Sequence, residues 1–232
     1  MRVGISGYVG NRLTGIGRVL IAIIDELAKQ HPEDKYIIFR NFDFKEYDCL
    51  GHYSNVELVN VSYTKESTAK NIWWHQWLFQ KLLKQYKCDL AYIPNFTLLL
   101  WKAVPTIVTI HDLIEYNVPG KFSKARMLYR KALCDPLMAK RSDHILTVSQ
   151  SSDNDIVKYL GVKPEKITLT LNATDKSVYK QYPQDEIEDV ISKYKLQYKE
   201  YLLFVGTIDY PGKNIKSVIE TFFNLRAIGE LQ

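Results

Sequence analysis

Residues 1–40, MRVGISGYVGNRLTGIGRVLIAIIDELAKQHPEDKYIIFR, decide the fold of this chain. Residues 2–6 form an apolar run that predicts a strand, and residues 36–40 form a second run dense in β-branched and aromatic side chains. Between them, apolar residues from Ile16 to Leu27 recur with the i, i+3, i+4, i+7 spacing of an amphipathic helix. Strand, helix and strand in this order predict neighbouring parallel strands.

The same alternation continues to about residue 171. Further strands are expected at residues 56–61, 90–93, 106–110, 144–148 and 166–171. Further helices are expected at residues 72–86, at 123–140 with an interruption near Pro136, and from the serine-rich run after residue 148 to a C-cap at Gly161. The predicted fold class is therefore α/β, a Rossmann-like parallel sheet with helices on both faces.

The character of the chain changes after Pro183. Residues 184–199 carry acids early and lysines late, which suits a helix that connects two domains. Residues 201–205 read as a strand and residues 214–228 as a helix, a single strand–helix unit without partner strands. We therefore expect a truncated second Rossmann-like domain, with domain limits at residues 1–182, 183–200 for the connection, and 201–232.

Composition limits the classes of function. The 232 residues, 46% hydrophobic and 25% charged, predict a folded chain long enough for one domain and part of another. A net charge of +5 suits an anionic partner such as a nucleotide diphosphate or an acidic membrane face, and is too small to indicate nucleic acid binding. We read neither a signal peptide nor a membrane span, so membrane contact is expected to be peripheral. Cys49, Cys88 and Cys134 are far apart, which predicts a cytoplasmic protein without a disulfide framework or zinc site.

Three segments follow predicted strands at their carboxyl ends, where doubly wound sheets bind ligands. Residues 14–18 (TGIGR) offer glycines and a helix start with free N–H groups for an anion, or form a plain tight turn. The second segment contains His111 and Asp112, and it has two interpretations. In the first, the His111 ring faces a ligand while Asp112 orients the turn. In the second, which the residue type alone slightly favours, His111 forms hydrogen bonds with buried backbone groups. The third segment holds Ser149, and its hydroxyls are most simply helix caps.

The second unit has a candidate anion site of its own. Gly206 ends the predicted strand, and Lys213 and Asn214 begin the predicted helix, an arrangement that can hold a diphosphate. A solvated surface lysine is the alternative. A dinucleotide-binding fold is disfavoured, because Leu20 stands where the glycine motif needs its third glycine and the second strand ends without an acidic residue.

Taken in order, these motifs resemble glycosyltransferase family four, retaining enzymes of the GT-B type that build bacterial surface polysaccharides. The resemblance spans nearly the whole chain. The segments that carry it are residues 14–18 (TGIGR), 74–76 (WHQ), 92–95 (YIPN), 108–113 (VTIHDL), 141–149 (RSDHILTVS), 172–175 (NATD), 203–208 (LFVGTI) and 213–214 (KN).

The resemblance implies two Rossmann-like domains, an amino domain that holds the acceptor and a carboxyl domain that holds the nucleotide sugar. It also implies catalysis without a metal or other cofactor, because basic side chains and helix N-termini stabilise the leaving diphosphate. The implied site comprises the catalytic residues His111 and Asp112, the substrate-binding residues Gly15, Gly17, Arg18 and Ser149, and the diphosphate-binding residues Gly206, Lys213 and Asn214.

The activity implied is transfer of a hexose from a nucleotide diphosphate sugar to a glycan or lipid-linked glycan, with retention. Three departures limit it. Ala173 and Gly212 stand where the family commonly has glycine and arginine, and the Glu-x7-Glu element that grips the donor is absent from the 232 residues. We therefore expect the chain by itself to be inactive. The alternative function is a non-catalytic acceptor-side module, or a truncated product that needs a partner subunit.

Residues 123–141 predict a basic helix, with six lysines and arginines against one acid, Asp135. Together with Met127, Leu128 and Leu137, this helix suits the anionic inner face of a membrane, where lipid-linked acceptors lie. The alternative, modestly favoured, is an ordinary amphipathic helix that packs on the sheet and turns its basic face to solvent.

Overall fold

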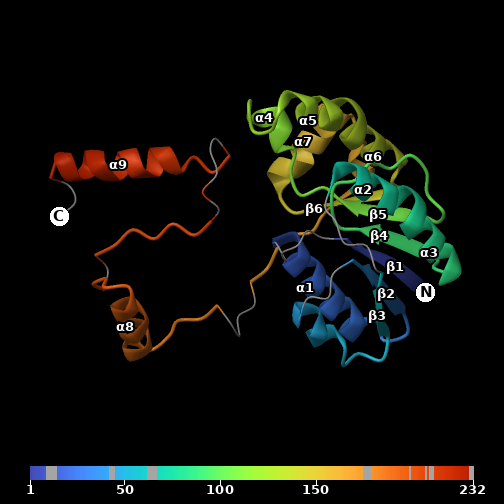
Figure 1. The fold of residues 1–232 in the computed structure, drawn as a ribbon, viewed down its shortest axis with the longest axis horizontal. Helices are drawn as coiled ribbons and strands as arrows, with labels where there is room; N and C mark the ends of the chain where they lie inside the picture. The colour runs from blue at the N-terminus through green and yellow to red at the C-terminus, as the bar shows by residue number, and fades with distance from the viewer. Residues whose placement is uncertain are drawn as a thin grey trace. The chain divides into compact units, whose positions relative to one another are not determined.

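The computed structural model describes residues 1–8, 15–41, 45–61, 67–174, 179–198, 200–206, 208 and 212–229. The chain divides into two compact units, Met1–Leu171 and Asn172–Gln232. The first unit contains a seven-stranded sheet (Figure 1). The predicted domain limits at residues 182 and 200 fall inside the second unit and stay predictions.

All strands of the sheet are parallel, in the order β3-β2-β1-β4-β5-β6-β7. They are β1 Arg2–Gly7, β2 Lys35–Arg40, β3 Val56–Asn60, β4 Leu90–Ile93, β5 Thr106–Thr109, β6 His144–Thr147 and β7 Ile167–Leu169. The strand order reverses between β1 and β4, the place where sheets of this kind bind ligands at the carboxyl ends of their strands. The predicted Rossmann-like α/β class is confirmed.

One face of the sheet is covered by α1, Gly15–Gln30, and by the short helix η1, Lys45–Leu50. Leu20 and Ile24 of α1 are fully buried against Ile5 and Ile38 of the two neighbouring strands. Leu20 and Ile24 are two of the apolar residues whose spacing predicted the amphipathic helix, and they form its inward face. The amphipathic pattern of the first forty residues therefore forms the core that it predicts.

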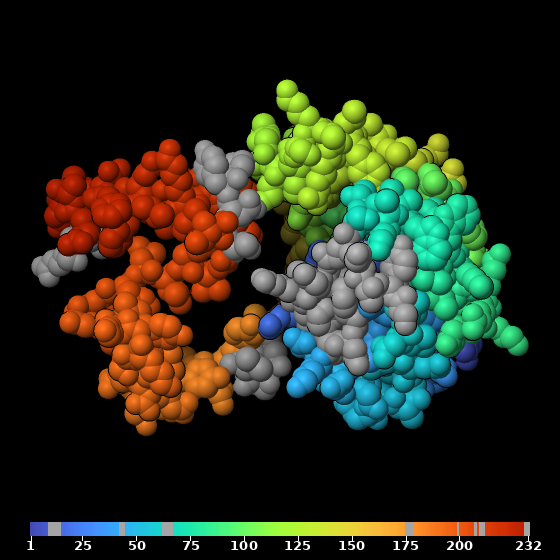
Figure 2. Space-filling view, in the orientation of Figure 1, coloured from blue at the N-terminus to red at the C-terminus, as the bar shows by residue number. Residues whose placement is uncertain are grey.

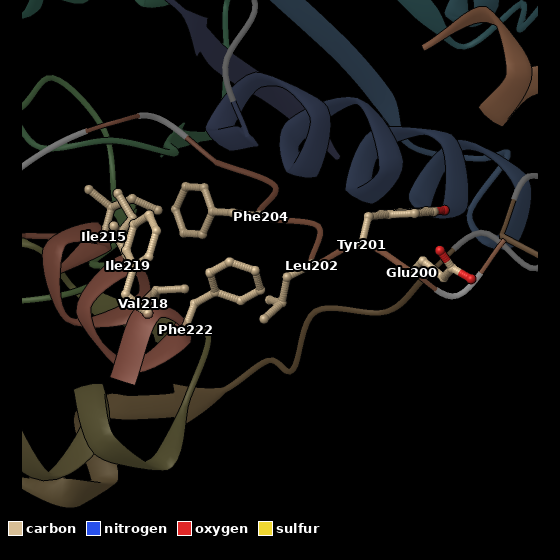
Figure 3. Close-up of a pocket in the computed structure, with 9 residues that line it drawn as sticks. Glu200, Tyr201, Leu202, Phe204, Ile215, Val218, Ile219 and Phe222 are labelled. Carbon is tan, nitrogen blue, oxygen red and sulfur yellow. The ribbon is translucent and has the colours of Figure 1, made fainter. Parts of the chain in front are cut away.

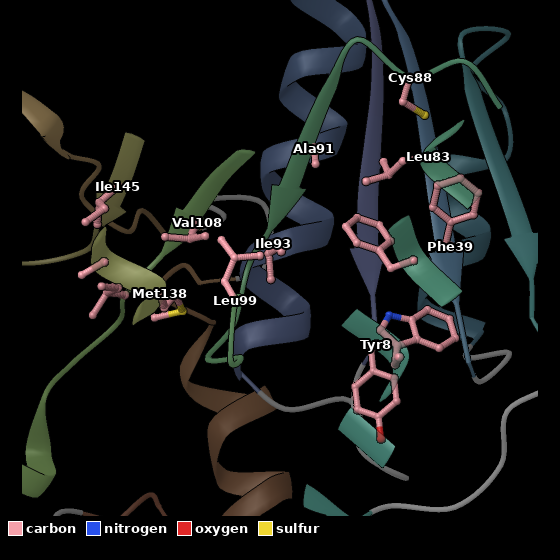
Figure 4. Packing of buried hydrophobic residues seen from close by; sticks show 14 of the residues in the cluster. Tyr8, Phe39, Leu83, Cys88, Ala91, Ile93, Leu99, Val108, Met138 and Ile145 are labelled. Atoms are coloured by element: carbon pink, nitrogen blue, oxygen red, sulfur yellow. The ribbon is translucent and has the colours of Figure 1, made fainter. Parts of the chain in front are cut away.

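The opposite face is covered by α3 (Phe79–Gln85), α6 (Asp135–Arg141) and α7 (Gln150–Leu160). Figure 4 shows part of this core, in which Leu83 of α3 lies on the side of Cys88 and Met138 of α6 lies on the side of Ile145. The helix α3 and the residues after it pack very closely on β1. A Cβ atom at Gly4 of β1 would lie only 2.2 Å from Cδ2 of Leu83 and 2.8 Å from Sγ of Cys88. Only glycine at this position allows that approach.

Two predicted helices each contain a π-helical turn. The first runs through α2 (Thr68–Trp73), η2 (Trp74–Leu78) and α3 (Phe79–Gln85). The second runs through α5 (Lys124–Tyr129), η3 (Arg130–Cys134) and α6 (Asp135–Arg141). The interruption predicted near Pro136 is confirmed, because proline has no N–H for the carbonyl one turn earlier. Nothing in the sequence indicated the first π-helical turn.

The remaining helices of the first unit are α4 Ile114–Asn117, α7 Gln150–Leu160 and η4 Pro164–Lys166. The helix α7 ends at Gly161, whose φ of 63° is left-handed, as the sequence predicted for its C-cap.

The second unit contains α8, Gln184–Lys193, and α9, Ile215–Ala227. Residues 201–205 do not form the predicted strand. A strand is held by hydrogen bonds to a neighbouring strand, and the described part of this unit supplies none. Instead Phe204, Ile219 and Phe222 gather around a small apolar pocket (Figure 3).

Candidate active site

The candidate site lies where the carboxyl ends of β1, β4, β5 and β6 meet at one edge of the parallel sheet. Of the residues that open α1, Gly17 is buried, while Gly15 and Arg18 are exposed. A Cβ atom at Gly15 would have no neighbour within 4 Å, so packing does not require the glycine there. Thr14, the first residue of that motif, lies outside the described residues.

His111 is held from three sides at this edge. Its ring donates from Nε2 to the carbonyl oxygen of Pro94, after β4, at 3.0 Å. Its own carbonyl accepts a hydrogen bond of 2.8 Å from the hydroxyl of Ser152 in α7. The preceding carbonyl, of Ile110, accepts one of 2.9 Å from the hydroxyl of Thr147 in β6. His111 therefore does satisfy a backbone group, and the ring is half-buried, so contact with a ligand stays a prediction.

Asp112 orients the turn that follows, as the sequence predicted. Its Oδ1 accepts a hydrogen bond of 3.2 Å from the backbone N–H of Ile114, the first residue of α4. The side chain is exposed. The structure thus brings His111 and Asp112 together at one turn and gives the aspartate a turn-forming role.

Ser149 is the N-cap of α7, which confirms the simpler of its two interpretations. Its Oγ accepts from the backbone N–H of Ser152 at 3.1 Å and donates to the Ser152 hydroxyl at 2.9 Å. Since Ser152 donates in turn to the carbonyl of His111, the cap also positions the histidine. Sequence reasoning noted the serine-rich run but not the contribution of Ser152.

A buried charge cluster fixes the segment after His111. The Nε atom of Arg130 lies 2.7 Å from Glu115 of α4 and 3.9 Å from Asp135 of α6, and both carboxylate side chains are fully buried. The guanidinium also lies 3.9 Å from the ring centre of Phe96, which follows β4. Arg130 therefore joins three segments at this edge. It does not belong to the solvated basic face that the sequence predicted for residues 123–141, and that part of the prediction is wrong.

The charge cluster contains two acids and one arginine. Burial, and then a hydrogen bond with Glu115, raise the pKa of Asp135 to about 8. At neutral pH the Asp135 carboxyl therefore keeps its proton. Sequence reasoning missed this cluster, because Glu115 comes from a different helix than Arg130 and Asp135, and each of the three resembles a surface residue.

A second buried polar group lies at the end of β1. The His75 ring donates from Nδ1 to the carbonyl of Asn71 at 2.9 Å and accepts at Nε2 from the Ser6 hydroxyl at 2.9 Å. The Trp74 indole donates to the same hydroxyl at 3.2 Å. Burial lowers the pKa of His75 to about 4, so the ring is neutral. Because these polar atoms satisfy one another, we assign them a structural role.

The predicted diphosphate-binding residues lie in the second unit. Gly206 and Lys213 are exposed. Asn214 has a left-handed φ of 46° at the start of α9, and its Oδ1 accepts a hydrogen bond of 3.0 Å from the Ser217 hydroxyl. The backbone N–H groups of this helix start are suited to an anion. Contact of all three residues with a donor stays a prediction.

Among the described residues, one group of side chains has metal-ligand spacing: His31, Glu33 and Asp34. They precede β2 and therefore lie at the amino edge of the sheet, opposite the candidate site. Asp34 already accepts a hydrogen bond of 2.6 Å from the terminal amine of Met1. This group has no part in the candidate site, and catalysis without a metal stays a prediction.

Comparison with known proteins places the chain in a family. Residues 13–178 match Glycosyltransferase Family 4. O-antigen chain mannosyltransferase B of Escherichia coli is 25% identical over an alignment of 232 positions, which covers 90% of this chain and 56% of that protein. O-antigen chain mannosyltransferase RfbU of Salmonella typhimurium is 31% identical over 113 residues, 49% of this chain and 27% of that protein. The chain thus spans about half the length of the first relative and less of the second.

Two solved structures resemble the fold. WaaG, a glycosyltransferase involved in lipopolysaccharide biosynthesis, has a TM-score of 0.67 at 16% identity, over 94% of this chain and 58% of that one. A glycosyltransferase from Rickettsia africae has a TM-score of 0.58 at 15% identity, over 100% of this chain and 67% of that one. These structures support the fold alone. Since the family match covers well over half of its residues, this chain belongs to glycosyltransferase family 4 and has the Rossmann-like architecture of GT-B enzymes.

Proposed function

We propose that the full-length protein transfers a hexose from a nucleotide diphosphate sugar to a glycan or lipid-linked glycan, with retention, in the synthesis of O-antigen or another bacterial surface polysaccharide. The observation that carries this proposal is His111, fixed at the carboxyl edge of the sheet in a family 4 chain. Both O-antigen relatives are mannosyltransferases, so mannose is the first hexose to test.

The geometry supports a division of roles between the two units. His111 is fixed by neighbouring elements, so its ring needs little reorganisation when a sugar reacts beside it. The start of α1, with Gly15 and Gly17, presents N–H groups to an acceptor or phosphate. In the second unit, Lys213 and the start of α9 are suited to the charge that develops on the leaving diphosphate.

The test is a transfer assay with the full-length protein. UDP-, GDP- and dTDP-hexoses, GDP-mannose first, are offered with lipid-linked and free glycan acceptors, and the anomeric configuration of the product is determined by NMR. We expect one donor to be used and its anomeric configuration to be kept. A protein that neither binds nor turns over any of these donors would overturn the proposal.

The variant His111→Ala tests the role of the ring in the same assay. We expect kcat/KM to fall at least about tenfold, which corresponds to ~1.4 kcal/mol of transition-state stabilisation. The matched control is His52→Ala, because His52 is exposed, precedes β3 at the amino edge of the sheet, and has its ring centre 3.9 Å from that of the neighbouring Tyr53. An unchanged rate in His111→Ala would leave the histidine a purely structural role.

The exposed apolar surface of the second unit bears on the alternative function. Leu203, Val205 and Phe223 are 70%, 84% and 62% exposed, which suits coverage by a partner subunit or by further chain. If the chain is a non-catalytic acceptor-side module, the 232 residues alone transfer no sugar and regain activity with a partner. Transfer by the purified chain unaided would exclude this alternative.

A further inference from the structure

An exposed group of tryptophan side chains lies on the helix formed by α2, η2 and α3. Trp73 and Trp77 are 44% and 58% exposed, and Leu100, in the loop after β4, is 42% exposed. The ring centre of Trp101 lies 6.3 Å from that of Trp77. We call these four residues the tryptophan patch. A large apolar cluster on the surface of a folded unit is typical of an interaction site.

Lysines surround the tryptophan patch. Lys70, Lys81 and Lys84 lie three, four or seven residues from Trp73 or Trp77 along the helix, so they share its outer face. The ammonium of Lys84 lies 5.7 Å from the ring centre of Trp101. Residues 67–88 contain four lysines and no aspartate or glutamate. The patch is therefore apolar at its centre and positive around it.

The buried side of the same helix holds the patch in place. The Gln76 amide donates to the carbonyl of Leu98 and accepts from the backbone N–H of Leu100 at 2.9 Å. Gln80 accepts from the backbone N–H of Ala103 at 2.7 Å. Both glutamines are buried. Two side chains of the helix thus fix the loop that carries Leu100 and Trp101, so the surface is formed before any partner binds.

The charge of the surface decides which partner it fits. A second copy of this chain, docked about a two-fold axis, would bring the lysines of both copies together, which disfavours a dimer. Tryptophan and lysine are the residue types that accumulate at the interface between water and lipid, and basic residues are attracted to anionic headgroups. Among the described residues, no helix is long and apolar enough to cross a membrane. A contact at the membrane surface therefore suits this patch.

We propose that the tryptophan patch docks the protein on an anionic membrane surface. This surface differs from residues 123–141, which the sequence offered for the same contact. There Leu128 is 69% exposed, but Arg130 is held in the charge cluster with 11% of its side chain exposed, and Met127 and Leu137 are half-buried. The helix formed by α2, η2 and α3, which carries the tryptophan patch, is teal in Figure 2 and lies on the side of the first unit that faces the viewer. The proposal does not depend on hexosyl transfer.

The test measures co-sedimentation of the 232-residue chain with vesicles, without donor or acceptor. Vesicles of phosphatidylglycerol and phosphatidylcholine are compared with phosphatidylcholine alone. We expect binding to the anionic vesicles, loss of binding in the double variant Trp73→Ser, Trp77→Ser, and a reduction of about fivefold per lysine in Lys81→Gln, Lys84→Gln. Leu128→Ser is the matched control, because it removes a still more exposed apolar side chain from the other basic helix. Circular dichroism checks that each variant is folded.

Three results would overturn the proposal. The first is unchanged vesicle binding of the folded tryptophan double variant, and the second is loss of binding in Leu128→Ser. The third is a dimer that the tryptophan substitutions abolish, combined with no vesicle binding, which would make a second copy the partner. In the full-length enzyme, transfer to an acceptor free in solution should survive the tryptophan substitutions, so loss of docking and loss of activity are distinguishable.

Discussion

The two units differ in what their apolar side chains contact. In the first unit, the apolar run of β4 includes Ile93, whose side chain is fully buried beneath the helices that cover the sheet. In the second, residues 201–205 are equally apolar, yet Leu203 and Val205 are 70% and 84% exposed. The two apolar runs have similar residue types, and they differ in their neighbours: β4 pairs with a strand on each side. An apolar segment becomes core only where neighbouring strands fix which side chains face the helices.

The largest expected effect contrasts a buried charge with an exposed one. Arg130→Ala leaves two carboxyl groups buried without their cation and should lower the free energy of unfolding by about 3–5 kcal/mol. Lys216→Ala in the second unit breaks a 3.6 Å pair with Glu220, both side chains largely exposed, and should have no measurable effect. All four tryptophans lie in the first unit, so urea unfolding followed by their fluorescence reports on that unit. A loss below about 1 kcal/mol in Arg130→Ala would show that the cluster contributes little to stability.

The next effect contrasts an apolar side chain in each unit. Leu83→Ala removes a fully buried side chain that packs over Gly4, and should lower the free energy of unfolding by about 2–5 kcal/mol. Phe223→Ala removes a larger side chain that is 62% exposed, and should change it by less than about 0.5 kcal/mol. The same fluorescence measurement serves for Leu83→Ala, and the circular dichroism of α9 serves for Phe223→Ala. Equal losses would mean that Phe223 is buried in solution.

The smallest effect is a slope in the pH dependence of stability. The pKa of Asp135 is raised to about 8 in the folded chain, against ~3.9 when unfolded. Between these values the folded chain binds more protons, so its free energy of unfolding should fall as pH rises. The pKa of His75, lowered to about 4 against ~6.5 unfolded, produces the opposite slope below pH ~6.5. Near pH 8 the terminal amine of Met1, whose pKa is raised by its hydrogen bond with Asp34, adds a slope of the same sign, so the Asp135 contribution is read between pH ~6.5 and ~8 as the difference between the chain and its Asp135→Asn variant. There, Asp135→Asn should flatten the slope in urea titrations, and parallel curves for both proteins would contradict the prediction.

The features that could be predicted from the sequence are local ones. The strand β4 has its predicted ends, and α7 has the predicted caps, because Ser149 and Gly161 act through neighbouring backbone groups. The charge cluster could not be predicted, since it depends on Glu115 and Arg130 meeting across two helices. The π-helical turn η2 contains Gln76, whose contacts with the loop after β4 are likewise tertiary and follow from no local pattern. The strand predicted at residues 201–205 is wrong for a related reason. A local sequence pattern can favour a strand, but it cannot supply the neighbouring strand with which it must pair.

At the candidate site, the sequence indicated the positions of His111, Asp112 and Ser149 but not the contacts between them. The turn role of Asp112 and the cap role of Ser149 follow from short-range chemistry and are confirmed. The link from Ser149 through Ser152 to His111 connects residues about forty positions apart, so it required the fold. The cytoplasmic location and the ligand contacts stay predictions.

The hydrogen bond between His111 and Pro94 also selects the tautomer of the imidazole. A carbonyl oxygen can only accept, so the neutral ring keeps its proton on Nε2 and leaves a lone pair on Nδ1. Such a lone pair attracts hydroxyl protons and repels phosphate oxygens. The imidazole is thereby suited to a sugar hydroxyl and unsuited to a diphosphate, whose oxygens require N–H groups and cations. One backbone carbonyl thus fixes which ring nitrogen of His111 carries the proton.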